Sequence, residues 1–255
     1  MTAPPALFTA FDRIRIVNLP SRTDRRAEME RELRQVGLAD DPRVAFFPAV
    51  ACDDRGPFLR KGSHGAFLSH LALLTEAAEA SETILILQDD CSFLLPAITA
   101  YRLPDHWDVF YGGYVASDPD NLTESNIIGA HFMGFSVQAA RMASDYLKRY
   151  LAPDFPPDTQ AARQPGFDPA IRPPIDGAFV WMRRAHPELL TTFAMLGVQR
   201  SSRTDIGDTR WFDRAPGLRK LAGLARRLRR RATGAQAQMK QENVHFGDEA
   251  SSPPN

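Results

Sequence analysis

The sequence is poor in cysteine, since Cys52 and Cys91 are the only two among 255 residues. So few cysteines exclude a disulfide framework and favour a reducing compartment. Long apolar runs are also missing, because none approaches the roughly 20 residues that a membrane-spanning helix needs. Residues 1–10 hold no positive cluster followed by an apolar core, as a secretory signal would. We therefore expect a cytoplasmic protein.

Charge of one sign is not in excess either, because 31 Lys and Arg residues balance 31 Asp and Glu residues. This balance does not indicate a polyanionic partner, and we expect no nucleic acid ligand. Several enzyme motifs are absent: Gly-x-Gly-x-x-Gly for dinucleotides, Gly-x-x-x-x-Gly-Lys for phosphates and His-Glu-x-x-His for zinc. The stretch from Gly134 to Ser136 does not complete a nucleophile elbow, since Val and Gln follow it.

What the sequence does contain is strands that alternate with helices. Apolar or β-branched runs at residues 14–19 (IRIVNL), 44–47, 83–87 (TILIL) and 108–111 predict strands. Helical patterns occupy residues 21–37, 64–80, 138–150 and 177–184, and the first has a capping-box sequence at its start. This alternation predicts an α/β, Rossmann-like fold with a mostly parallel sheet and helices on both faces.

Composition divides the chain into four parts. We expect an N-terminal extension at residues 1–12 and a main domain at residues 13–213. A basic segment at residues 214–240 and a polar, disordered tail at residues 241–255 complete the chain. Within the main domain, residues 153–174 are rich in Pro, Asp and Gln and predict a long, partly mobile loop.

The basic segment contains no acidic residue, and apolar residues recur in it at helical spacing. The part that begins at Arg219 and ends at Arg231 can therefore form a basic amphipathic helix. Such a helix suits the anionic surface of an inner membrane. The alternative is a helix that docks on the main domain and leaves its basic face in solvent.

An acidic pair, Asp89 and Asp90, directly follows the apolar run at residues 83–87. Ligands of open α/β sheets bind beyond the carboxyl ends of the strands, so the pair is expected at the ligand edge. Carboxylates there can hold a hard divalent cation, which can in turn hold a diphosphate. The alternative is a pair that only begins a turn. Asp118 and Asp120 form a second pair, but they lie in turn sequence with no strand before it.

Polar side chains also gather where the first predicted strand meets its helix: Asn18, Arg22, Arg25 and Arg26. Such a junction commonly receives a nucleotide, and guanidinium groups bind phosphate oxygens through paired hydrogen bonds. The alternative is that these arginines are solvated on a first helical turn, because no glycine-rich phosphate loop accompanies them.

Six short segments point to a more specific assignment. They are residues 16–19 (IVNL) with 24–26 (DRR), 65–71 (GAFLSHL), 85–90 (LILQDD), 130–132 (AHF), 174–176 (PID), and Gln199 with 202–206 (SRTDI). Together and in this order they resemble the family 25 glycosyltransferases, the lipooligosaccharide-biosynthesis type. The resemblance implies a type A glycosyltransferase fold, a UDP-sugar donor, Mn²⁺ or Mg²⁺, and inverting transfer of galactose or glucose. The acceptor it implies is a glycan or glycolipid of cell-surface, LPS-type polysaccharide.

One position departs from the family pattern, since Gln88 replaces the acid that commonly opens its Glu-Asp-Asp sequence. Glutamine keeps a carbonyl oxygen but loses a negative charge, so either metal binding is weaker or this position is not a direct ligand. The departure keeps open an alternative function, a catalytically degenerate relative that binds a nucleotide or glycan without transfer.

By matching positions, the resemblance also implies roles for individual residues. Asp90 is the first choice of metal ligand and Asp89 the second, with Asp205 and His245 as candidates to complete the set. Asp176 is the candidate base that removes the acceptor hydroxyl proton. The residues implied in nucleotide-sugar binding are Asn18, Arg22, Arg26, Ser69, His70, Gln199 and Ser202.

Most of these roles have a structural alternative. His70 can be a buried histidine that ties a helix to the sheet, and a core or supporting role is favoured over metal ligation for His131. Asp176 can simply cap the helix that follows it. Gln199 and Ser202 can equally fasten a loop.

Overall fold

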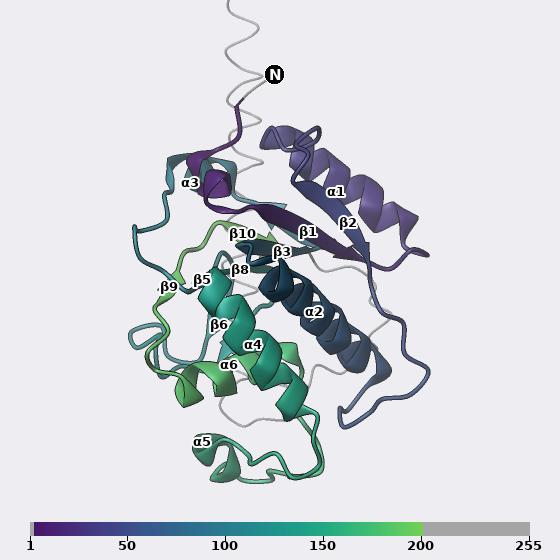
Figure 1. Cartoon of the computed structure of the whole chain (residues 1–255), viewed down its shortest axis with the longest axis vertical. Coiled ribbons are helices and arrows are strands. Elements are labelled where there is room, and N and C mark those ends of the chain that lie inside the picture. Colours follow the sequence, from purple (N-terminus) through teal and green to yellow (C-terminus); the bar gives the residue numbers. More distant parts are fainter. Residues whose placement is uncertain (1–2, 201–255) are drawn as a thin grey trace, which may run out of the picture. The chain divides into compact units, whose positions relative to one another are not determined.

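A computed structural model describes residues 3–200. At its centre is a six-stranded sheet with the order β2-β1-β3-β8-β5-β9 (Figure 1). These strands are β1 Arg13–Asn18, β2 Val44–Pro48, β3 Ile84–Gln88, β5 Val109–Tyr111, β8 Phe132–Phe135 and β9 Thr191–Phe193. β8 is antiparallel to both of its neighbours and every other pairing is parallel. The predicted mostly parallel sheet is thus confirmed.

Helices cover both faces of this sheet, as predicted (Figure 1). One face carries α2 Lys61–Ala80, α4 Val137–Tyr150 and α6 Ile175–Ala185. The other carries α1 Thr23–Gln35, with the short η1 Ala6–Ala10 and α3 Leu95–Ala100.

The side chains of β3 show why this strand is apolar throughout. Ile84 and Ile86 enter the core beneath α2 and α4, whereas Leu85 and Leu87 enter the core beneath α1. Successive side chains of a strand point to opposite faces, so a strand that is covered on both faces needs a continuous apolar run. β3 is therefore a rigid central element, and it presents whatever follows it at a fixed place.

The start of α1 differs from the predicted capping box. Arg22 is the residue before the helix and makes no side-chain capping hydrogen bond. Its guanidinium instead donates to both carboxylate oxygens of Asp24, at 2.9 and 2.7 Å. The predicted end is confirmed, because Gly37 has a φ of 69° and the Leu38 amide closes back on the Leu33 carbonyl at 2.9 Å.

Several short elements were not predicted, η1, α3, β8 and β9 among them. The others are α5 Thr159–Ala162 and the two-stranded pairs β4 Cys91–Phe93 with β10 Gly197–Gln199, and β6 Val115–Ala116 with β7 Ile127–Ile128. α5 lies inside the predicted loop at residues 153–174, and Arg184 holds its capping residue Asp158 at 3.0 Å. Elements of two to four residues are too short to carry a readable periodicity.

Residues 3–12 lie ahead of β1 and pack against the sheet. Leu7, Phe8 and Phe11 are buried in the core that α1 covers, and the Asp12 carboxylate accepts hydrogen bonds from Thr83. Within residues 3–200, no helix combines the length and apolarity needed to cross a membrane. The predictions for residues 214–240 and 241–255, including the basic amphipathic helix, lie outside the described residues.

Candidate functional site

The acidic pair Asp89 and Asp90 lies at the edge of the sheet where the parallel strands end. Both residues follow β3 directly, and the Asp89 amide donates to the Val17 carbonyl of β1 at 3.1 Å. β10 lies beside β4, with Gln199 opposite Cys91, and so reaches the same place from a distant part of the sequence. The pair is buried, with 5% and 6% of the two residues exposed. The predicted ligand edge therefore does contain the acidic pair.

Two neighbours hold the Asp89 carboxylate. Oδ2 accepts a hydrogen bond from the Asn18 amide at 2.7 Å, and Oδ1 accepts one from the Arg25 guanidinium at 3.1 Å. Asn18 also donates to the backbone carbonyl of Arg22 at 3.2 Å. Both oxygens of Asp89 are thus occupied, and the residue is fixed between β1 and α1.

Asp90 differs, because only one of its oxygens is occupied. Oδ2 accepts a hydrogen bond from the Gln199 amide at 3.1 Å and lies 3.8 Å from the Arg25 guanidinium. Oδ1 is buried and has no hydrogen-bond partner among the described residues. Burial raises the pKa of Asp90, Arg25 opposes that shift, and the neighbouring Asp89 charge adds to it. A buried carboxylate oxygen without a partner is costly, which indicates a place prepared for a positively charged group.

Arg200 fixes the backbone around the acidic pair. Its guanidinium donates to the carbonyls of Asp89 at 2.5 Å and Cys91 at 2.8 Å, and to the Ser92 hydroxyl at 3.0 Å. Its own amide donates to the Asp90 carbonyl at 2.7 Å. Sequence reasoning assigned no role to Arg200 and gave Arg25 no individual role, yet Arg200 holds the backbone of the pair and Arg25 lies near both carboxylates.

Two glutamates of α1 add negative charge to this region. Glu28 and Glu32 lie 3.2 and 3.6 Å from the Arg200 guanidinium. Together with the acidic pair they make four carboxylates, and among residues 3–200 the guanidinium groups that pair with them are those of Arg25 and Arg200. Among residues 3–200, this contact network carries an excess of negative charge.

The acidic pair does not form a complete metal site with other side chains of residues 3–200. No group of three or more His, Cys, Asp and Glu side chains among them is arranged to hold a metal ion. The partnerless oxygen of Asp90 and the excess of carboxylates do fit one hard divalent cation, which commonly keeps waters and takes phosphate oxygens as further ligands. The other predicted ligands, Asp205 and His245, lie outside the described residues.

A second group of predicted residues gathers around α2 and the start of α6. The Ser69 hydroxyl donates to the Gly65 carbonyl at 2.8 Å and accepts from the Val50 amide at 2.9 Å. The His70 ring is buried, with Nδ1 2.8 Å from the Ala66 carbonyl and Nε2 3.3 Å from the Ala130 carbonyl. Both side chains therefore engage backbone groups, and for His70 this is the structural alternative described above.

Asp176 belongs to the same group. It is the second residue of α6, whereas Pro174 occupies the capping position that the alternative gave to Asp176. Its Oδ2 accepts a hydrogen bond from the Gly129 amide at 3.1 Å, one residue before the carbonyl that His70 contacts. Burial raises the pKa of Asp176. A carboxylate with a raised pKa is a stronger base, so the environment suits proton abstraction.

Two residues that were predicted to bind the nucleotide are not placed at the acidic pair by the described part of the structure. Arg26 pairs with Glu30 at 3.1 Å and lies over the Phe46 ring, 4.1 Å from its centre, toward the β2 side of α1. Ser202 lies outside the described residues. The nucleotide-binding roles of Arg26 and Ser202 stay predictions.

His131 is buried just before β8, and neither ring nitrogen makes a hydrogen bond of good geometry with any residue from 3 to 200. Two glycines allow the backbone to approach it: a Cβ built on Gly113 would lie 2.5 Å from Nε2, and a Cβ built on Gly129 would lie 3.4 Å from Cε1. Burial lowers the pKa of His131 to about 4, although the Gly197 backbone opposes the shift. The ring is thus a neutral core group, in line with the predicted core or supporting role.

Acidification from pH 7 to pH 5 is expected to cost about 2 kcal/mol of stability through His131 alone. Its folded pKa of about 4 lies below the ordinary value of 6.5, so the unfolded chain takes up the extra proton. The contribution is present above pH 6.5 and is lost as the pH falls toward 4. Urea unfolding of the wild type and His131→Leu at both pH values measures the difference.

The loss between pH 7 and pH 5 should be larger in the wild type than in His131→Leu, since other titrating groups are common to both. His106→Leu, at an exposed histidine, is the matched control and should follow the wild type. Equal losses in the wild type and His131→Leu would show that the ring is already protonated or solvated in the folded state.

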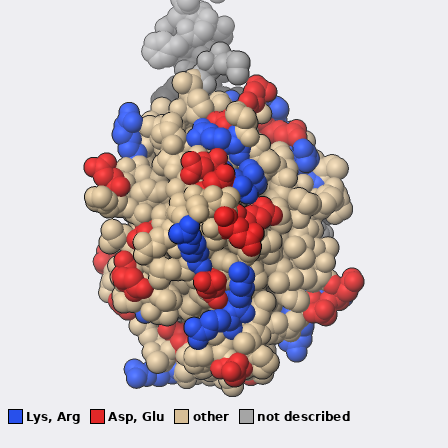
Figure 2. Space-filling model, in the orientation of Figure 1, with Lys and Arg blue, Asp and Glu red and all other residues tan. Residues whose placement is uncertain are grey.

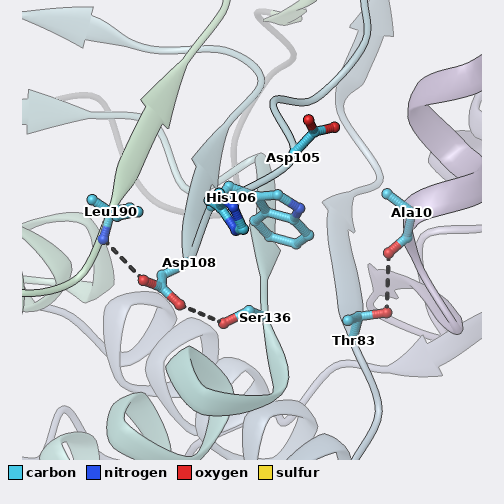
Figure 3. Close-up of a pocket in the computed structure, with 8 residues that line it drawn as sticks. Ala10, Thr83, Asp105, His106, Asp108, Ser136 and Leu190 are labelled. Atoms are coloured by element: carbon cyan, nitrogen blue, oxygen red, sulfur yellow. Dashed lines mark hydrogen bonds between the residues drawn. The ribbon is translucent and has the colours of Figure 1, made fainter.

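A separate pocket of about 350 Å³ lies at the opposite edge of the sheet, beside Thr83 and Asp108 (Figure 3). Its Asp108 carboxylate accepts hydrogen bonds from the Ser136 hydroxyl at 2.9 Å and the Leu190 amide at 3.0 Å. Thr83 donates to the Ala10 carbonyl at 3.1 Å. These hydrogen bonds connect the ends of neighbouring strands. The pocket therefore lies at the edge of the sheet opposite the predicted ligand edge.

Charged side chains of both signs lie on the face of the molecule that Figure 2 shows. On the face shown in Figure 2, Lys and Arg side chains are interspersed with Asp and Glu side chains.

Comparisons with known proteins leave the family assignment as a prediction. The chain matches no protein-family model and no curated protein sequence. Among solved structures, the fold is similar to that of mouse xyloside xylosyltransferase 1 in its apo form. The identity is 14%, the match covers 75% of this chain and 77% of that chain, and the TM-score is 0.39. Membership of the family 25 glycosyltransferases stays a prediction from the six sequence segments.

Proposed function

We propose that the protein is a glycosyltransferase with a type A fold that transfers a hexose from a UDP-sugar to a glycan acceptor. The observation that carries this proposal is the acidic pair, buried at the carboxyl edge of the sheet with the partnerless Oδ1 of Asp90. A nucleotide-sugar donor brings two phosphates that need a cation at such a place, and the neighbouring arginines suit phosphate oxygens.

In this proposal Asp90, supported by Asp89, would hold Mn²⁺ or Mg²⁺. The cation would neutralise the charge that develops on the departing diphosphate. Asn18 keeps Asp89 oriented, Gln199 orients Asp90, and Arg200 fixes the backbone that carries both. Because each of these groups is already in place, the backbone that carries the acidic pair needs little rearrangement before the site accepts a donor.

Asp176 is the proposed base of an inverting transfer. The Gly129 amide anchors one carboxylate oxygen, and burial makes the group more basic. His70 and Ser69 act from beside it by fixing α2 against the backbone at Ala130 and Val50. Arg22 and Arg26 are proposed to meet the nucleotide, as is Ser202.

The finer points of the proposal come from the resemblance. They are transfer of galactose or glucose, a glycolipid acceptor in LPS-type polysaccharide assembly, and peripheral attachment to the inner membrane through the basic segment from Arg219 to Arg231. A cytoplasmic location accords with each of them.

The proposal is tested with a panel of UDP-sugars, with and without Mn²⁺, by measuring the release of UDP and the binding of UDP by calorimetry. Metal-dependent release from one donor is the expected result, and it identifies the sugar. Failure of both release and metal-dependent UDP binding favours the degenerate relative suggested by Gln88. Binding of UDP without release indicates that the acceptor is missing from the assay.

Asp176→Asn is expected to lower transfer to an acceptor by about a hundredfold and to leave UDP binding unchanged. Asparagine keeps an oxygen for the Gly129 amide but cannot take a proton. Initial rates of transfer and UDP titrations of the variant measure the two effects. Asp145→Asn, at an exposed aspartate of α4, should change neither. A variant that transfers at a near-normal rate would remove Asp176 from the role of base.

A further inference from the structure

Arg25 occupies an unusual position for a residue of a proposed donor site. Its guanidinium lies between the two members of the acidic pair, 3.1 Å from Asp89 and 3.8 Å from Asp90. The three side chains are only 13%, 8% and 9% exposed, so water screens their charges weakly. Arg25 therefore already supplies a positive charge at the place where a divalent cation would go.

One feature remains unsatisfied even with Arg25 in this position. Asp90 is more than nine-tenths buried, and its Oδ1 has no hydrogen-bond partner among the described residues. A single guanidinium also leaves an excess of carboxylates in the contact network, as Glu28 and Glu32 engage Arg200. The site is thus suited to a stronger positive charge than Arg25 provides.

We propose that Arg25 is a resident counter-ion, which holds the acidic pair until a divalent cation enters and then turns to the donor diphosphate. This inference rests on the proposed function. Arg25 is the third residue of α1, and its long side chain can move without a change in the helix. The planar guanidinium matches phosphate oxygens as well as carboxylate oxygens, so both positions provide good partners.

The proposal predicts effects of opposite sign for one substitution. Arg25→Met removes a positive charge that competes with the cation, so Mn²⁺ alone should bind more tightly. The same substitution removes a phosphate ligand, so UDP should bind more weakly when Mn²⁺ is saturating. If Arg25 merely supported Asp89, its removal would weaken both the binding of Mn²⁺ alone and the binding of UDP at saturating Mn²⁺.

The first measurement is Mn²⁺ binding to the full chain without nucleotide, by electron paramagnetic resonance. Arg25→Met is expected to bind Mn²⁺ about tenfold more tightly than the wild type, and Arg25→Lys to stay close to the wild type. UDP calorimetry at saturating Mn²⁺ should show about tenfold weaker binding in Arg25→Met. Arg31→Met, an exposed arginine of the same helix, is the matched control and should change neither constant.

Unchanged or weaker Mn²⁺ binding in Arg25→Met overturns the counter-ion role, as does a wild type that binds no Mn²⁺. If Arg25→Met does not fold, as judged by its circular dichroism, Arg25→Gln replaces it. The expected changes are the same: tighter binding of Mn²⁺ and weaker binding of UDP. If Arg25→Met binds Mn²⁺ more tightly than the wild type but neither protein binds UDP, the counter-ion role of Arg25 is retained and the transferase proposal is refuted. If the protein binds UDP but Arg25→Met does not bind Mn²⁺ more tightly than the wild type, the counter-ion role is refuted and the transferase proposal is retained.

Discussion

Asp90→Asn is expected to lower UDP release from the donor by about a thousandfold, which corresponds to roughly 4 kcal/mol of barrier. Asparagine has nearly the same shape and keeps an oxygen for the Gln199 amide. It lacks the charge that the buried Oδ1 offers to a cation. The rate of UDP release and the dissociation constant of Mn²⁺ should therefore change together, while the unfolding transition stays in place.

Asp118→Asn is the matched control for this variant. Asp118 belongs to the second acidic pair of the sequence, and its carboxylate accepts the Asp120 amide at 3.1 Å in an exposed turn. The control should release UDP at the wild-type rate. If Asp90→Asn kept more than about a tenth of the rate, Asp90 would not be the principal ligand.

Arg183→Met is expected to lower the free energy of unfolding by about 4 kcal/mol. The guanidinium is buried, and it donates to the carbonyls of Thr123 and Ser125, each at 3.1 Å. It also lies 5.6 and 5.4 Å from the ring centres of Tyr111 and Phe193. Methionine fills part of the space but leaves buried carbonyl oxygens without a donor.

Urea unfolding at pH 7 measures this loss, and hydrogen exchange of residues 117–126 locates it. Arg149→Met, at an exposed arginine near the end of α4, should change stability by less than about 0.5 kcal/mol. A loss below about 1 kcal/mol in Arg183→Met would mean that water replaces the guanidinium and that the loop does not depend on it.

Much of the fold was predictable because its signals are local. β3 is a continuous apolar run followed by charged residues, and Gly37, which has a positive φ, lies just beyond the end of α1. The antiparallel β8 was not predictable, since Phe132–Phe135 is short, apolar on both faces and interrupted by a glycine. Its direction follows from its pairing with β3 and β5, which lie more than 20 residues away in the sequence.

The contacts of the candidate site also divide into those that local sequence signals predict and those that depend on long-range packing. The contact between Asn18 and Asp89 follows from the rule that parallel strands end at one edge, so sequence reasoning could anticipate it. Which arginine faces the pair depends on the rotation of α1, where neighbouring residues point about 100° apart. Arg25 therefore contacts the carboxylates, whereas Arg26 lies over Phe46. Arg200 arrives only through the pairing of β10 with β4.

The two cysteines acquire a practical use from this arrangement. Cys91 directly follows the acidic pair and is fully buried, and burial raises the pKa of its thiol well above the ordinary value. Cys52 is partly exposed between β2 and α2. A thiol reagent should therefore modify Cys52 first, and it should reach Cys91 only when β4 and β10 separate. The rate at which Cys91 is modified therefore reports how often the site opens. A bound donor should lower that rate.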